Sequence, residues 1–200
     1  MSKAGVSRSQ CMNIHSFLSR SRVNGPGVRS VLWLQGCNRS CPGCFNPEAL
    51  PATGGESVAV SDVLDWLPQR EIEGVTFSGG EPFLQAAPLA MLGEAIRARG
   101  LSVLVYTGYL IDEIERSGKE DWIDLLSVAD ILIDGPYLKD VPPNHRWAGS
   151  GNQRVHILGD GIDFDDSDRS KDSSSEEGEI EFSIDNEGLV TVTGFPEGWT

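Results

Sequence analysis

Apolar segments of strand-like composition alternate with segments of helical spacing over the first 135 residues, and this alternation constrains the fold most strongly. Strand-like segments are expected at residues 28–34, 75–77, 101–106 and 131–133. Helical spacing is found at residues 62–67, 89–99, 111–114 and 122–126. Because apolar strands that alternate with helices are typical of a parallel sheet covered by helices, the sequence predicts an α/β fold. The pattern alone does not decide whether the sheet closes into a barrel.

Four turns in this region directly follow a predicted strand. They are Gly36-Cys37, Ser78-Gly79-Gly80-Glu81-Pro82, Tyr106-Thr107-Gly108 and Asp134-Gly135. Parallel α/β folds bind their ligands at the carboxyl ends of the strands, where loops carry function without disturbing the core. Turn formation explains the glycines of any single loop equally well. The four loops taken together predict a ligand site where they converge.

The negative charge is concentrated in one segment. The 200 residues contain 16 Lys and Arg against 30 Asp and Glu, which gives a net charge of −14. Between Asp160 and Glu181, ten acidic and two basic residues account for −8 of this charge. Phosphate contacts need a basic surface, so the balance argues against a nucleic-acid-binding protein. The acidic segment is too polar to offset its own ordering entropy, and we interpret it as a solvated loop or linker.

Charge and turn signals divide the chain into three parts. These are a main domain at residues 1–158, an acidic disordered insert or linker at 159–178, and a β-hairpin packing on the domain at 179–196. The hairpin is indicated by strand-like segments on either side of Asp185-Asn186-Glu187-Gly188. No apolar run approaches the ~20 residues that span a bilayer. The first 30 residues lack the apolar block of a secretion signal, so a cytoplasmic protein is expected.

Three of the four cysteines fall within eight residues. Cys37, Cys41 and Cys44 form a CxxxCxxC segment, whereas Cys11 stands apart. A secreted disulfide framework spreads an even set of cysteines along a short chain, so this cluster indicates local chemistry instead.

Three kinds of site use such thiols, each in its own way. Structural zinc needs four ligands, more often from two CxxC pairs, and only one such pair is present. A thiol redox site at Cys41 and Cys44 leaves Cys37 without a role. A 4Fe-4S cluster uses all three thiolates and leaves one of its irons open, where a substrate or cofactor can bind.

The CxxxCxxC segment, followed directly by the aromatic Phe45, resembles the signature of the radical S-adenosylmethionine enzymes. The turn at residues 78–82 is similar to the Gly-Gly-Glu loop of that superfamily, which receives the methionine amino group of S-adenosylmethionine. Two glycines let the backbone approach a ligand, and Glu81 supplies acceptor oxygens to a charged ammonium group.

Further motifs narrow this resemblance to one family. Residues 24–29, 34–37, 41–48, 130–137 and 146–154 together resemble the activating proteins of anaerobic (class III) ribonucleotide reductases. The resemblance runs from about Asn13 to Arg154, and the terminal hairpin and Gly194-Phe195-Pro196 are also similar to the family, whereas the acidic insert departs from it. It implies one 4Fe-4S cluster on Cys37, Cys41 and Cys44, and S-adenosyl-L-methionine that is reductively cleaved to a 5′-deoxyadenosyl radical.

The resemblance also implies a fold and partners. The fold would be an incomplete parallel (β/α) barrel of the radical S-adenosylmethionine type with a C-terminal β-hairpin. The partners would be a glycyl radical enzyme, expected to be an anaerobic ribonucleotide reductase, and an electron donor such as flavodoxin or ferredoxin. Four cysteines leave too few ligands for a second cluster. The alternatives are a radical enzyme acting on a different protein or small molecule, and a non-catalytic iron–sulfur or zinc module.

The residues expected to bind S-adenosylmethionine come from the loops at the strand ends. They are Phe45, Ser78, Gly79, Gly80, Glu81, Thr107 and Asp134. Phe45 would pack beside the cluster, Thr107 would contact the methionyl or ribose part, and Asp134 would bond ribose hydroxyls. A core, turn or cap role explains these last three residues as well. No catalytic residue is expected beyond the ligands of the two cofactors.

Overall fold

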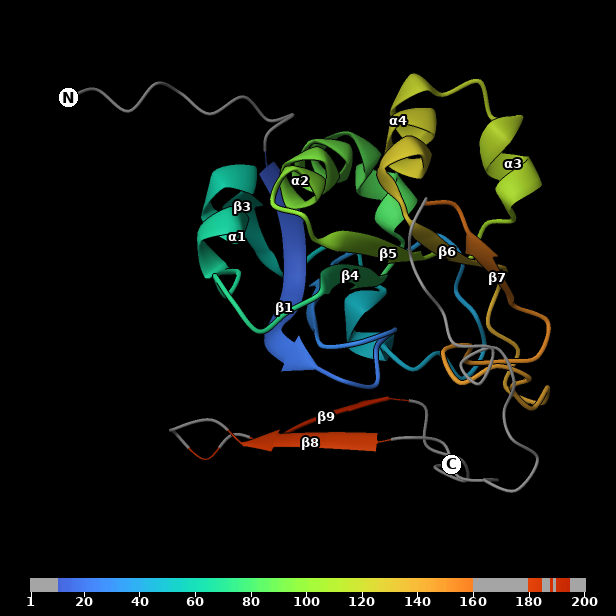
Figure 1. Cartoon of the computed structure of the whole chain (residues 1–200). Helices are drawn as coiled ribbons and strands as arrows, with labels where there is room; N and C mark the ends of the chain where they lie inside the picture. The colour runs from blue at the N-terminus through green and yellow to red at the C-terminus, as the bar shows by residue number, and fades with distance from the viewer. Residues whose placement is uncertain (1–10, 160–179, 185–187, 189, 195–200) are drawn as a thin grey trace.

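The computed structural model describes residues 11–159, 180–184, 188 and 190–194, and Figure 1 shows a sheet with helices packed on one side. Seven of the described strands form this sheet, in the order β3-β1-β2-β4-β5-β6-β7. Their bounds are β1 Cys11–Ser21, β2 Arg29–Leu34, β3 Glu56–Ala59, β4 Gly74–Gly79, β5 Ser102–Tyr106, β6 Ile131–Asp134 and β7 Arg154–Ile157. Strands β2, β4, β5 and β6 run parallel, which confirms the predicted α/β fold with a parallel sheet. Strands β1, β3 and β7 pair antiparallel with their neighbours.

The central strands are buried on both faces and are mainly apolar. All six residues of β2 and all four of β6 are buried, and Val75 and Phe77 of β4 are fully buried. Continuous apolar strands of this kind are typical of parallel sheets that are enclosed on both sides. They hold the loops at their carboxyl ends in fixed positions.

The helices pack mainly on one face of the sheet (Figure 1). They are α1 Val60–Trp66, α2 Ala86–Ala98, α3 Ile111–Glu115 and α4 Glu120–Val128, with 3₁₀ helices η2 Pro47–Ala49 and η3 Pro82–Gln85. On α2 the residues at helical spacing, Leu89, Leu92 and Ile96, are completely buried in the core. One stripe of α2 thus anchors the helix layer on the sheet.

Arg29 joins three parallel strands near their amino ends. It is 1% exposed, and its guanidinium donates hydrogen bonds to Thr76 Oγ1 and the Val75 carbonyl of β4 and to Ser102 of β5. Burial lowers the pKa of Arg29 to about 10. A Cβ at Gly74 would lie 2.4 Å from the guanidinium, so glycine makes room for it. This network lies at the opposite end of the strands from the loops predicted to form the site.

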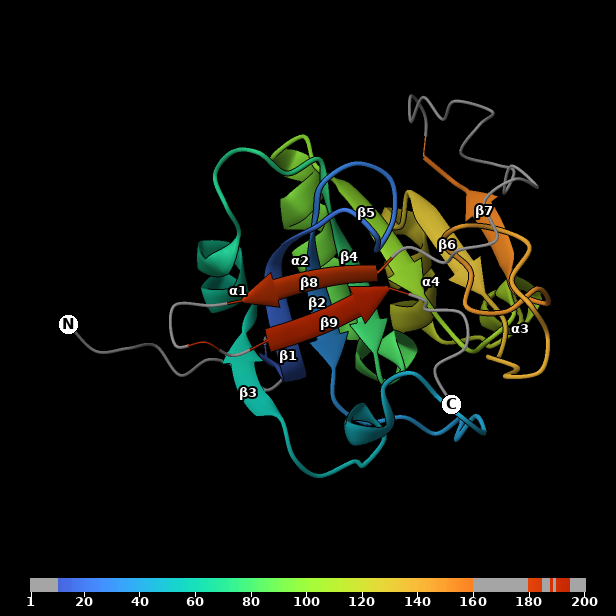
Figure 2. The same ribbon diagram turned by 90° about the horizontal axis from the view of Figure 1, so that it is seen from below.

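Strands β8 (Ile180–Ile184) and β9 (Val190–Gly194) form a separate antiparallel hairpin, which confirms the predicted C-terminal hairpin. It lies below the sheet in Figure 1 and crosses in front of it in Figure 2. Residues 160–179, most of the predicted acidic insert, lie outside the described part of the chain, as does most of the hairpin turn. No helix in the described part has the length and apolar character that a membrane crossing requires.

Candidate functional site

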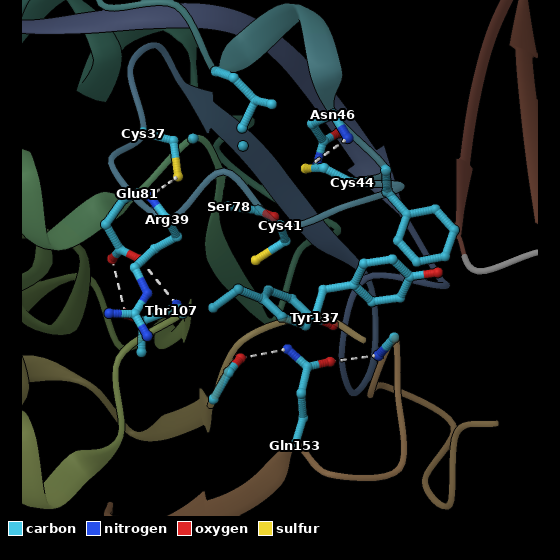
Figure 3. Close-up of a pocket in the computed structure, with 18 residues that line it drawn as sticks. Cys37, Arg39, Cys41, Cys44, Asn46, Ser78, Glu81, Thr107, Tyr137 and Gln153 are labelled. Atoms are coloured by element: carbon cyan, nitrogen blue, oxygen red, sulfur yellow. Dashed lines mark hydrogen bonds between the residues drawn. The ribbon is translucent and has the colours of Figure 1, made fainter. Parts of the chain in front are cut away.

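A pocket opens at the carboxyl edge of the four parallel strands (Figure 3). The loops after β2, β4, β5 and β6 line it, and the segment before β7 adds Gly149 and Gln153. Every predicted site residue except Asp134 lies in its wall, namely Cys37, Cys41, Cys44, Phe45, Ser78, Gly79, Gly80, Glu81 and Thr107. The loops therefore meet in one space, and the ligand roles of these residues stay predictions.

The cysteine loop begins at Gly36, where β2 ends. Gly36 has a φ of 98°, a conformation that glycine adopts without strain. Its N–H donates to the Ala49 carbonyl at 2.8 Å, and the Cys37 N–H donates to the Leu50 carbonyl at 3.0 Å. These bonds fasten the start of the loop to η2, which follows the last cysteine. The loop is thereby held at both ends.

All four cysteines lie among the described residues, and all are free thiols. Cys37 Sγ accepts a hydrogen bond from the Arg39 N–H, and Cys44 Sγ accepts one from the Asn46 N–H, each at 3.4 Å. Burial raises the pKa of both thiols, and these N–H donors oppose it by favouring the thiolate. Hydrogen bonds to the ligand sulfurs also tune the reduction potential of a bound iron–sulfur cluster.

The three thiols of the loop surround one space, as the ligands of a cluster must. Within residues 11–159 and the described part of the hairpin, no three His, Cys, Asp or Glu side chains are grouped to hold a single metal ion. A cubane cluster does not require such a group, because each cysteine binds a different iron. Cys37, Cys41 and Cys44 are all partly buried and line the same pocket. The donor set and its placement fit a 4Fe-4S cluster.

The loop after β4 packs backbone to backbone on the cysteine loop. The Gly80 N–H donates to the Leu34 carbonyl at 2.7 Å, and the Glu81 N–H donates to the Gly36 carbonyl at 2.9 Å. A Cβ on Gly80 would lie 2.2 Å from the Gly36 oxygen, and one on Gly79 would lie 2.4 Å from the Leu34 nitrogen. Both positions therefore require glycine, and the two motifs form one structural unit.

Glu81 connects the loop after β4 to the loop after β5 through its carboxylate. It is 1% exposed and accepts hydrogen bonds from the Phe83 N–H at 3.0 Å, the Thr107 hydroxyl at 2.8 Å and the Gly108 N–H at 2.9 Å. Burial raises the pKa of Glu81 to about 6, and the three donors limit the rise. A carboxylate has about four acceptor sites, so capacity for a further donor remains. Thr107 orients this carboxylate as well as lining the pocket.

Phe45 belongs to an aromatic pair at the edge of the pocket. The side chain is 39% exposed, which does not fit an ordinary core aromatic. Its ring centroid lies 4.7 Å from that of Tyr137, with the rings tilted at 52°. Tyr137 was not predicted as a site residue, although it ends the 130–137 motif and lies three residues after β6. The pair forms an aromatic wall beside Cys44.

Arg39 is a second pocket residue that the sequence motifs did not predict. It lies inside the CxxxCxxC segment, and its guanidinium is stacked over the Tyr109 ring at 4.7 Å from the centroid. The Asn38 amide donates to the Tyr109 hydroxyl at 2.7 Å. The segment between the first two cysteines is thus fixed against the loop after β5. Only the position of Arg39 between two predicted ligands signals this role in the sequence.

Asp134 is the predicted site residue that the structure does not bring into the pocket, because its carboxylate is directed to other partners. Asp134 is fully buried and does not line the pocket. It accepts bonds from Arg154 at 3.0 and 2.5 Å and from the Ile111 N–H at 2.7 Å, and His156 lies at 3.2 Å. Burial alone raises the pKa of Asp134, but these bonds outweigh burial and leave it lowered. The residue holds β7 and the start of α3 on the end of β6.

Residues 23–156 match the protein family described as a 4Fe-4S single cluster domain. The matched region contains the three pocket cysteines and the Gly-Gly-Glu loop, and it ends before the hairpin. The class of protein that the fold and site define is therefore a single-cluster iron–sulfur domain, in agreement with the thiol arrangement.

Individual relatives define the family more closely. The anaerobic ribonucleoside-triphosphate reductase-activating protein of Escherichia coli (strain K12) is 35% identical, over 74% of this chain and 99% of its own length. The protein of that name from Enterobacteria phage T4 is 32% identical, over 70% of this chain and 90% of its own. This chain belongs to the family of anaerobic ribonucleoside-triphosphate reductase-activating proteins, which confirms the resemblance of its motifs.

Two other proteins are similar to part of this chain. The pyruvate formate-lyase-activating enzyme of Clostridium pasteurianum is 33% identical, over 61% of this chain and 54% of its own length. Among solved structures, QueE from Escherichia coli aligns with 49% of this chain and 53% of its own, with a TM-score of 0.40 and 17% identity.

Proposed function

We propose that this chain cleaves S-adenosylmethionine reductively and generates a glycyl radical on an anaerobic ribonucleoside-triphosphate reductase. The observation that carries the proposal is the single pocket shared by the CxxxCxxC thiols and the Gly-Gly-Glu loop. Membership of the activating-protein family supports both the chemistry and the partner. The chain is accordingly an oxidoreductase of the radical S-adenosylmethionine type.

Cys37, Cys41 and Cys44 would hold one 4Fe-4S cluster and leave one iron without a protein ligand. With both cofactors bound, the pocket would supply the chemistry of reductive cleavage: one electron from the cluster would convert S-adenosylmethionine to methionine and a 5′-deoxyadenosyl radical, and this radical would take a hydrogen atom from a glycine Cα of the partner to give 5′-deoxyadenosine. The proposed source of the electron is a small redox protein such as flavodoxin or ferredoxin.

The other pocket residues bind and orient. Ser78, Gly79 and Gly80 would present their backbone to the methionyl part, since the absence of side chains on the two glycines lets this loop pack against β2 and the cysteine loop. Glu81 would accept from the ammonium group with the acceptor capacity that its three present donors leave. Thr107 would keep that carboxylate oriented.

Phe45 and Tyr137 would cover the cofactors on one side, because their paired rings line the pocket next to Cys44. Apolar cover of this kind keeps water away from a reactive radical. Asp134 has no part in the proposed site.

The proposal extends to the organisation of the chain. The parallel strands would form part of an incomplete (β/α) barrel with the cluster at its mouth. Residues 1–158 would be the catalytic domain, residues 159–178 a linker and residues 179–196 a hairpin unit packed on the domain. The protein would act in the cytoplasm.

Anaerobic reconstitution with iron and sulfide tests the proposal. The wild-type chain is expected to take up about four irons and, once reduced with dithionite, to release 5′-deoxyadenosine from S-adenosylmethionine. The Cys11→Ser variant is the matched control, since Cys11 lies on β1 and does not line the pocket. A chain that retains zinc and takes up no iron would contradict the proposed 4Fe-4S cluster. A chain that takes up the cluster but releases no 5′-deoxyadenosine would be an iron–sulfur binding module without this activity.

A further inference from the structure

The hairpin of β8 and β9 presents four exposed apolar side chains. Phe182 and Ile184 on β8 are 61% and 70% exposed, and Val190 and Val192 on β9 are 52% and 43% exposed. Phe182 is paired with Val192, and Ile184 with Val190. Directly paired residues, and residues two apart on one strand, share a face of a sheet. These four side chains therefore form one patch, the hairpin apolar face.

The opposite face of the hairpin is polar and contacts the domain. It carries the alternate residues Glu181, Ser183, Thr191 and Thr193. The Glu181 carboxylate accepts from the Arg22 N–H at 3.0 Å, and Thr193 Oγ1 accepts from the Asn24 amide at 2.9 Å. An antiparallel sheet with one solvated face normally turns its apolar face to the core. The hairpin has the reverse orientation.

In this orientation the hairpin apolar face does not pack on the described part of the domain. A two-stranded hairpin is marginally stable in water and gains most from burying an apolar face. Contiguous exposed apolar patches mark interaction surfaces, whereas single exposed apolar residues are ordinary. The face is therefore suited to a binding partner.

A second cavity places the hairpin beside the proposed active site. Cys44, Phe45 and Asn46 line it on the side of the cysteine loop, and Thr191 and Val192 line it on the side of β9. Cys44, Phe45 and Asn46 also line the thiol pocket, so the two spaces share a wall. In Figure 2 the hairpin lies across β1, β2 and β4, and both β2 and β4 end at the edge that carries the site loops. A chain that runs through the cavity reaches the hairpin and the cysteine loop together.

We propose that the hairpin apolar face docks the glycyl radical enzyme, and that an extended segment carrying the reactive glycine runs through the cavity to the thiol pocket. The inference rests on the proposed function, which requires a polypeptide to bring a glycine Cα to this pocket. In the described part of the chain β8 and β9 pair only with each other, so each has a free edge. An extended segment can add to such an edge as a further strand.

A second copy of this chain fits the hairpin apolar face less well. Stable interfaces bury roughly 800 Å² on each partner, more than four side chains supply. A docked reductase adds contacts in the cavity and at the pocket to those on the hairpin, so a small face is sufficient. The region that matches the cluster-domain family ends at residue 156, so cluster binding does not account for the hairpin.

The test compares two double variants for binding to the immobilised anaerobic ribonucleoside-triphosphate reductase of the same source. Phe182→Thr with Ile184→Thr removes the apolar surface and keeps a β-branched residue that suits a strand. Met91→Gln with Ile123→Gln is the matched control, because both residues are 41% exposed and lie on α2 and α4. The hairpin variant is expected to bind at least about tenfold more weakly, and the control is expected to bind as the wild type does.

Release of 5′-deoxyadenosine without the reductase separates docking from chemistry. The four apolar residues do not line the thiol pocket, so the hairpin variant is expected to keep this release. Its glycyl radical yield at subsaturating reductase is expected to fall in parallel with its affinity. A wild-type chain that cleaves no S-adenosylmethionine contradicts the proposed function. A wild-type chain that cleaves it and activates the reductase, with a hairpin variant that binds equally well, overturns the docking inference alone.

Two further measurements test whether the hairpin apolar face binds a second copy of this chain, and whether a second hairpin variant has the same effect as the first. Sedimentation of the free wild-type chain is expected to show a monomer, and a dimer that the hairpin variant dissociates would assign the face to a second copy and overturn the inference. If the first hairpin variant loses its iron, Val190→Thr with Val192→Thr on β9 replaces it. Unchanged reductase affinity in that second pair overturns the inference, and a comparable loss supports it.

Discussion

The Glu81 N–H donates a hydrogen bond to the Gly36 carbonyl at 2.9 Å, and this contact joins the loop that carries the thiols to the Gly-Gly-Glu loop. The two loops begin at the carboxyl ends of adjacent parallel strands, β2 and β4. Under the proposed function, a cluster held by one loop and a cofactor held by the other would thereby lie side by side. The contact needs close backbone approach, which the glycines provide.

The Gly80→Ala substitution tests this contact. The new Cβ would lie 2.2 Å from the Gly36 oxygen, so the two loops must separate. The free energy of unfolding is expected to fall by about 1–3 kcal/mol, and the reconstituted variant is expected to lose S-adenosylmethionine binding. Urea unfolding and equilibrium dialysis measure the two effects. Gly100→Ala serves as the control for cofactor binding and should keep it, because no atom lies within 4 Å of the new Cβ; its φ of 76° strains an alanine, so its stability also falls without any contact between the two loops. Normal binding by Gly80→Ala would show that the loops are not a unit.

Arg29→Lys tests the network at the amino ends of the strands. A lysine cannot replace the guanidinium fork, so buried acceptors on β4 and β5 lose their donors. The free energy of unfolding should fall by about 3 kcal/mol or more. Arg99→Lys is the control, because that side chain makes an exposed bond to the Leu64 carbonyl and its loss should cost at most about 0.5 kcal/mol. Equal urea midpoints for the two variants would contradict the structural role of Arg29.

Asp134→Asn tests the structural role of Asp134. Burial alone raises the pKa of the carboxyl, but the bonds from Arg154 and the Ile111 N–H hold it below its ordinary value of 3.8. A lowered pKa in the folded state contributes stability above the ordinary pKa, and that stability is lost as the pH falls through the folded value. The variant should therefore be less stable by about 1–3 kcal/mol at neutral pH.

The difference between wild type and Asp134→Asn should shrink as the pH falls below 3.8, the ordinary pKa of this group. Urea unfolding at several pH values measures it. Because Asp134 does not line the pocket, S-adenosylmethionine cleavage by the reconstituted variant should persist at neutral pH. A selective loss of cofactor affinity with unchanged stability would restore the ribose-binding role first predicted for this residue.

The sequence predicts the central strands well because they are buried on both faces. The short buried segments predicted at residues 75–77 and 131–133 lie within β4 and β6, where burial on both faces restricts the choice of residue. Strands β1, β3 and β7 have mixed exposure, and each forms by pairing with a strand that lies elsewhere in the sequence. Local pattern carries little information about such pairing.

The site residues also fall into two groups, those that local sequence predicts and those that depend on contacts between distant segments. The cysteines and glycines follow from spacing and from turn chemistry, both of which are local. Asp134 has the expected position at a strand end, but the antiparallel pairing of β6 with β7 places Arg154 opposite it and takes up its carboxylate. Tyr137 and the hairpin apolar face depend on contacts between distant segments, which spacing does not encode.

Electron paramagnetic resonance of the reductase is the most direct test of the central claim. The reconstituted chain is mixed anaerobically with dithionite, S-adenosylmethionine and the anaerobic ribonucleoside-triphosphate reductase of the same source. The wild-type chain and Cys11→Ser are expected to produce a glycyl radical signal on the reductase, and Cys41→Ser is expected to produce none because one thiol ligand is missing. An equal signal from Cys41→Ser, or no signal from a wild-type chain that holds its iron and cleaves S-adenosylmethionine, would contradict this account.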